Sequence, residues 1–353
     1  MQYKHPCKKF FRIQKIQYMT PEINIIVNMA NNWYSPNIDR SIIKELKKRS
    51  DLPGWQHMIT FFWLLLAFGI ACYYTYGTWW FLIPYFAYCT LWGGADAVWH
   101  ECGHRTAFKS RKLNDFFYNI ASYMNNFEPV RWRWSHALHH TNTGSTDPHD
   151  FESDNQIFAK PSLFGFLLMF VPGSAFLTIH KSLYVEIIQH ALGIKTRVML
   201  EAIPERERWK CVLSSRIFVA IWISIIVWSY ITWSLLPILL FLVPKFFATL
   251  NIVWGITQHW GLPENEKDHR ISTRSVKLNP VFSFIYWNME YHIEHHMFPV
   301  VPSYNLPKLH EHIKHELPEP LTLWQAYKQI IPAVIKKHKD PTYSIKQNIP
   351  LTT

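Results

Sequence analysis

Motifs that carry redox cofactors are scarce in this chain. Its five cysteines are scattered without a Cys-x-x-Cys pair, at Cys7, Cys72, Cys89, Cys102 and Cys211. That pattern excludes a disulfide framework and a zinc-ribbon or rubredoxin-type site. The sequence also has no heme-binding His-Pro-Gly-Gly and no glycine-rich flavin or phosphate loop. Any redox reaction here therefore needs electrons from a separate protein or module.

A signal peptide is also missing from the sequence, because no apolar run precedes a small-residue cleavage site near the N-terminus. Residues 1–52 are instead polar and basic, and they predict a basic cytosolic N-terminal segment. The formal net charge is +11. In a soluble protein such a charge would suggest nucleic acid as a partner. Here the basic residues flank apolar runs, so an anionic membrane surface explains the charge better and no nucleic acid is expected.

Long apolar runs occur as two pairs. Ile59–Tyr76 and Trp79–Gly94 are separated only by a short uncharged turn, and Ile217–Trp233 and Leu235–Trp254 repeat that pattern. Runs of this length cross the hydrocarbon core as helices. The sequence therefore predicts an all-α integral membrane protein with about four transmembrane helices in two hairpins.

The distribution of charge orients this multi-pass protein. Both tails and the loop of residues 98–216 carry the basic residues, so the positive-inside rule places them in the cytosol. We expect residues 53–320 to form one membrane domain with a cytosolic helical cap. Residues 321–353 are expected to form a cytosolic C-terminal tail.

Three histidine clusters lie on the cytosolic side of this predicted topology. They are a His-x-x-x-His pair and two His-x-x-His-His triples, formed by His100 and His104, by His136, His139 and His140, and by His292, His295 and His296. With 19 histidines in 353 residues, a pair arises by chance about once, whereas a triple arises only about 0.05 times. Residues spaced by three and four share one helix face. The eight histidines are therefore predicted metal ligands.

Acidic residues near these clusters are candidates to orient the imidazoles through their second ring nitrogen. We select Asp147, Asp150 and Glu294 first, with Glu101 and Glu128 as further candidates. Asp147 and Asp150 could equally be parts of an Asp-Pro turn. A fourth cluster of His310, His312 and His315 lacks the triple spacing and lies among charged residues, so we interpret it as a solvated helix face.

Two other functions fit the histidines less well. A zinc hydrolase would explain the His-Glu-x-x-His form of residues 100–104 but neither triple. A membrane metal transporter would hold its ligands near the middle of the bilayer, whereas these histidines lie outside the predicted spans.

At these clusters the sequence resembles the membrane fatty acid desaturase/hydroxylase superfamily, from about Pro53 to Pro320. That superfamily has three histidine boxes in this order on the cytosolic side of a helical membrane core. More closely, Trp99–Phe108, Arg133–Thr141 and Glu290–Pro299 are similar to the branch that includes rhizopine-type oxygenases, as is the stretch Tyr327–Tyr343.

The resemblance implies a non-heme di-iron centre that uses O2. All eight box histidines would be ligands, and His259 matches by position the ninth histidine of the family. Acyl-CoA desaturases also have an asparagine four residues before that histidine, which holds a ligand water. Gly255, which has no side chain to hold a water, stands there in this chain, and Gln258 is the candidate substitute.

The chemistry follows from the metal, because acid–base side chains cannot cleave an unactivated C–H bond. We expect a fatty acid (acyl-lipid) desaturase of lipid metabolism, taking an amphiphilic substrate from the bilayer. The alternative is a hydroxylase or monooxygenase acting on a lipid or on a small methylated compound, since the boxes do not fix the outcome. The electron donor would be a ferredoxin-, rubredoxin- or cytochrome-type protein.

Overall fold

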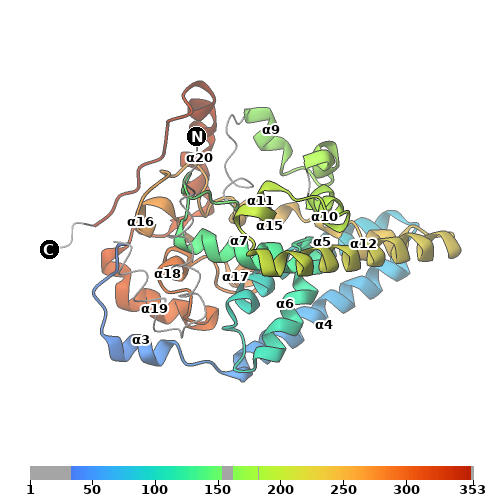
Figure 1. Ribbon diagram of the computed structural model, residues 1–353, viewed down its shortest axis with the longest axis horizontal. Helices are drawn as coiled ribbons and strands as arrows, with labels where there is room; N and C mark the ends of the chain where they lie inside the picture. The colour runs from blue at the N-terminus through green and yellow to red at the C-terminus, as the bar shows by residue number, and fades with distance from the viewer. Residues whose placement is uncertain (1–32, 153–161, 182, 351–353) are drawn as a thin grey trace, which may run out of the picture.

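The computed structural model describes residues 33–152, 162–181 and 183–350 (Figure 1). The described residues are mostly helical, as the sequence predicts. Most of the predicted N-terminal segment, residues 1–32, lies outside them. One parallel pair of two-residue strands, β1 (Val276–Lys277) and β2 (Leu321–Thr322), is the only sheet in the described part of the chain.

Two helices of the described residues are long and apolar enough to cross a membrane. They are α4 (Asp51–Thr75) and the segment Glu205–Ile231, which contains α12 (Arg208–Ile231). Both extend toward the same side of the molecule, at the right of Figure 1. Large apolar side chains are exposed along them, including Trp63 at 66% and Ile223 at 56%. Such surfaces suit contact with lipid.

The fourth predicted span differs from a membrane helix. Residues 236–255 form three short helices, α13 (Leu236–Phe241), α14 (Pro244–Phe247) and α15 (Thr249–Gly255). Pro237 lies in the first turn of α13 and Pro244 in that of α14. Proline has no N–H to donate to the preceding turn, so each one starts a new helix.

The central helix α5 (Leu82–His104) follows α4 after a turn at Gly77 and runs into the core, where most of its residues from Tyr88 to Cys102 are buried. Its glycines permit close helix packing. A Cβ at Gly93 would lie 2.5 Å from Asn251 Oδ1, and a Cβ at Gly94 would lie 2.5 Å from Ile285 Cγ2. The middle of α5 thereby packs closely against α15 and α17 (Pro280–Tyr286).

Two further helices complete the frame of the site. They are α7 (Pro129–Thr141), capped by the Glu128 side chain, and α18 (His292–Met297). The C-terminal helix α20 (Leu323–Lys339) contributes buried Ile330 and Val334 to a cluster with Trp260.

The other helices are α3 (Arg40–Leu46), α6 (Arg111–Asn125), α9 (Leu163–Leu168), α10 (Leu183–Ala191), α11 (Arg197–Glu201), α16 (His269–Ser272) and α19 (Leu306–Ile313). Short 3₁₀ helices are η2 (Trp79–Phe81), η3 (Ser174–Lys181), η4 (Glu205–Glu207), η5 (Ser303–Asn305) and η6 (Lys314–Glu316).

Candidate metal centre

Three helices bring the histidine clusters together in the core. The C-terminal end of α5 carries the first pair, α7 carries the first triple and α18 carries the second triple. His259 joins them from the turn that follows α15. All nine histidines selected from the sequence therefore lie in one region, arranged as two adjacent groups.

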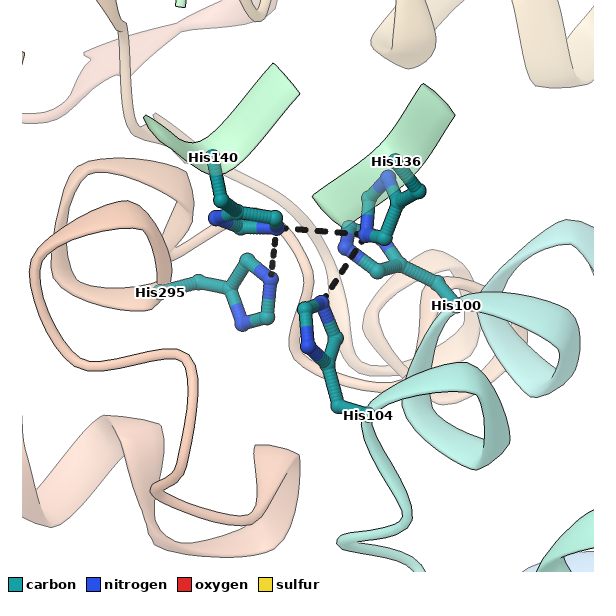
Figure 2. Close-up of side chains that lie close together, drawn as sticks. All are labelled: His100, His104, His136, His140 and His295. Carbon is teal, nitrogen blue, oxygen red and sulfur yellow. Dashed lines mark hydrogen bonds between the residues drawn. The ribbon is translucent and has the colours of Figure 1, made fainter. Parts of the chain in front are cut away.

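The first group contains five histidines. Their ligand atoms lie within 4.8 Å of one another, and the members are His100, His104, His136, His140 and His295 (Figure 2). The Nε2 atom of His136 lies 2.9 Å from that of His104 and 3.1 Å from that of His140. Figure 2 shows the five rings converging from α5, α7 and the α18 region on one point.

The second group contains four histidines. The ligand atoms of His139, His259 and His296 lie within 4.8 Å of one another. His292 joins them, because its Nε2 lies 3.0 Å from that of His259 and 3.1 Å from that of His296. The groups touch where the rings of His140 and His296 are 4.4 Å apart.

The protonation of these imidazoles suits a metal. Burial, reinforced by neighbouring imidazoles, holds the pKa of His140, His295 and His296 well below the usual range. Neutral imidazoles have a lone pair available for a metal ion. His100 Nε2 is buried and has no hydrogen-bond partner among the described residues, as expected of an atom that awaits a ligand. Dense neutral nitrogen donors fit iron and other first-row metals.

Polar partners hold the outer nitrogens of several rings. His139 Nδ1 donates to Asp150 at 2.8 Å, His136 Nδ1 to Glu152 at 3.0 Å and His259 Nδ1 to the Ser272 carbonyl at 2.9 Å. These contacts place the proton on Nδ1 and leave Nε2 free to face the group. Burial would lower the pKa of His139, but the charge and hydrogen bond of Asp150 outweigh it and raise that pKa to about 9.

Thr143 completes the second group's outer contacts. Its hydroxyl donates to the His139 carbonyl at 2.7 Å, which leaves the oxygen free to accept from His296 Nδ1 at 3.2 Å. The Gln258 side-chain amide lies 3.2 Å from His292 Nδ1, on the outer side of that ring. At Gly255 an added Cβ would meet nothing within 4 Å. Gln258 therefore contacts the outer nitrogen of His292, and the space beside Gly255 is open.

The acidic residues selected from the sequence have different surroundings. Asp150 is buried against His139, whereas Asp147 is exposed. Glu294 is buried and accepts from Ser275 Oγ at 2.7 Å and from His310 Nδ1. Glu101 accepts from the Ser303 N–H at 3.1 Å and so connects α5 to the start of η5.

Glu152 and His310 have surroundings that the sequence did not predict. Glu152, the partner of His136, was missed, because its only signal is its closeness in sequence to Asp150. The prediction of a solvated face is wrong for His310, whose imidazole is paired with Glu294 and only 13% exposed. His312 and His315 are exposed, as predicted.

Known proteins resemble this chain. The family described as fatty acid desaturase matches residues 77–327. A protein of Synechocystis sp. named sn-1 oleoyl-lipid 12-desaturase is 27% identical over 270 residues, covering 67% of this chain and 70% of that protein. A second Synechocystis protein, named sn-1 acyl-lipid omega-3 desaturase (ferredoxin), is 24% identical over 288 residues, covering 70% of this chain and 73% of its own length.

Proposed function

Because this chain belongs to the fatty acid desaturase family, we propose that it is a membrane-bound acyl-lipid desaturase that uses O2. The single observation that carries this proposal is the convergence of nine histidines on two adjacent points. The family implies non-heme iron, and the donor set fits it, because it is built of imidazole nitrogens in a buried site. His139, whose pKa is about 9, would give up a proton on binding the metal ion. The narrower likeness to the rhizopine branch stays a prediction.

We assign one iron ion to each histidine group. His100, His104, His136, His140 and His295 would hold the first ion, and His139, His259, His292 and His296 the second. Bound iron would supply the oxidising power toward unactivated C–H bonds that protein side chains lack.

Residues around the two groups would fix the orientation of the ligand rings. Asp150 and Glu152 hold the protons of His139 and His136 on Nδ1, which keeps both rings in one orientation. Glu294 connects the third box to His310 and Ser275. Because the box histidines other than His104 are buried, bulk water would be largely kept from the metals, which protects an oxidising centre from side reactions.

The membrane arrangement follows the charge pattern. We propose that α4 with the apolar start of α5, and α12 with α13–α15, form two hairpins that enter the bilayer from the cytosol. In this multi-pass arrangement the histidine groups lie in a cytosolic cap, and an acyl chain reaches them from the lipid. We retain the division into residues 1–52, 53–320 and 321–353 as part of this proposal.

The electron donor is a separate protein in this proposal. A relative's name includes ferredoxin, and a small acidic iron–sulfur protein would complement a chain of net charge +11. Loss of activity at high salt, with the donor held constant, would support docking of this kind.

Mass spectrometry of the lipids and polar metabolites of cells that express the chain tests the function. We expect new acyl chains that lack two hydrogen atoms, formed by the natural chain and by His312→Ala but not by His139→Ala. A gain of one oxygen atom would establish the hydroxylase alternative instead. The same profile from the natural chain and His139→Ala, with a working donor present, would contradict the proposal.

A further inference from the structure

One buried histidine outside the boxes lies directly beside the second group. His269 begins the short helix α16 and is 2% exposed. Its ring centroid lies 5.1 Å from that of His296. Within the second group, the ring of His296 lies 4.9 Å from that of His139 and 4.8 Å from that of His259. The distance between the rings of His269 and His296 is thus close to the ring distances within the second group.

The polar contacts of His269 differ from those of its neighbours. The outer nitrogens of His139, His259 and His296 each have a hydrogen-bond partner. His269 Nδ1 is buried and has none in the described part of the chain. A buried nitrogen without a partner is costly and calls for an explanation such as a missing ion.

The position of α16 is fixed by groups other than His269. Asp268 caps the helix and pairs with Arg270 at 2.7 Å, and the Arg270 guanidinium also reaches the Glu316 carbonyl. At the other end, the Ser272 carbonyl holds His259 Nδ1. The same four-residue helix therefore orients one proposed ligand and presents a second imidazole to the same group.

We propose that His269 supplies a further nitrogen ligand to the metal ion of the second group. This inference rests on the proposed function, because it needs an ion at that position. It would give the second ion five imidazoles, the number that converge in the first group. The assignment also provides a partner for His269 Nδ1, which has no hydrogen-bond partner among the described residues.

A packing role is the competing explanation, because His269 stacks on Trp33 with centroids 4.2 Å apart and an interplanar angle of 12°. His57 provides a matched control. It is also buried and stacks on Trp287 with centroids 3.9 Å apart and an interplanar angle of 2°. Its Nε2 has no hydrogen-bond partner among the residues that the structure describes. It lies on α4 among aromatic rings, with Phe61 and Phe284 as further neighbours.

The test compares His269→Phe with His57→Phe in the full chain, purified in detergent and loaded with Fe(II). Phenylalanine keeps the stacking surface and removes the nitrogens. Iron per chain is measured against increasing chelator. We expect His269→Phe to release about one of its two ions at a roughly tenfold lower chelator concentration, with His57→Phe matching the natural chain. Co(II) in place of iron should give stronger visible absorption in His269→Phe, because fewer ligands surround the second ion.

Three results would overturn the inference. Unchanged iron retention in His269→Phe would leave His269 as a packing residue and the proposed function intact. Equal loss of iron from both variants would assign the effect to packing. A natural chain that retains no iron at all would remove the proposed function together with this inference.

Discussion

The Nδ1 atom of His139 lies 2.8 Å from a carboxylate oxygen of Asp150, and both side chains are buried. This pair joins the first triple to the turn that follows α7, and it determines which nitrogen of His139 faces the second group. The same Asp150 oxygen accepts from the Gly144 N–H at 2.9 Å, which fixes the carboxylate itself.

Replacement of Asp150 by asparagine should weaken the second metal site. The amide would keep the size of the side chain but lose the charge that favours the Nδ1 proton of His139. We expect iron affinity at the second group to fall roughly 10–100-fold, as is usual for such partners. Metal analysis during chelator titration measures this. Asp147→Asn is the matched control, since Asp147 is exposed in the same turn; an equal loss there would refute the role of Asp150.

Glu152 should orient a histidine of the first group, as Asp150 orients His139 of the second. Its carboxylate contacts His136 Nδ1, and His136 Nε2 faces His104 and His140. Glu152→Gln should therefore lower iron affinity at the first group roughly tenfold and spare the second. Mössbauer spectra of ⁵⁷Fe-loaded protein distinguish the two sites. The assignment fails if Glu152→Gln and Asp150→Asn deplete the same iron signal.

Replacement of Gly93 by alanine should destabilise the protein, because even a methyl group has no room there. An alanine Cβ there would lie 2.5 Å from Asn251 Oδ1 and 2.6 Å from Ala248 Cβ, so α15 must shift. Overpacking of this kind costs about 1–3 kcal/mol, and the shift would also move His259, which follows α15. We expect a lower melting temperature and less iron in Gly93→Ala. Gly255→Ala, where the space is open, should show neither change.

The metal-free protein should lose stability as the pH falls below 6.5. Burial and the neighbouring His139 lower the pKa of His259 from 6.5 to about 3 in the fold. Between these values only the unfolded chain binds the proton, so stability falls by about 1.4 kcal/mol per pH unit for each such group. His139 acts oppositely, because its raised pKa favours the folded state until the pH rises through about 9.

Thermal unfolding of metal-free protein in detergent, followed from neutral pH to about pH 5, measures this slope. His259→Gln should give a shallower decline than the natural chain. A melting temperature that stays constant or rises on acidification would contradict the assignment of a neutral His259.

The histidine groups show what the sequence could predict. The spacing of three and four places His136, His139 and His140 on one face of α7, and the structure places them so. Spacing does not reveal that His139 belongs to one group and its neighbour His140 to the other. That division depends on how α7 lies between α5 and α18, which is tertiary packing.

Several features depend on local structure that the sequence does not show. Residues 235–254 are apolar enough to suggest a span, yet Pro237 and Pro244 divide them into short helices. Asp147 and Asp150 look alike in sequence, but the turn between them exposes one and buries the other. His310 resembles its charged neighbours on α19, and only the approach of α18 pairs it with Glu294.

The first metal group unites His140 with His295, which lie 155 residues apart in the chain. No earlier segment can substitute for α18, because the third box supplies histidines to both groups. During synthesis the membrane helices and the first two boxes exist before a complete site does. If the histidine groups hold iron as proposed, iron could therefore be loaded only after α18 has been synthesised, and iron scarcity would leave a full-length, inactive chain.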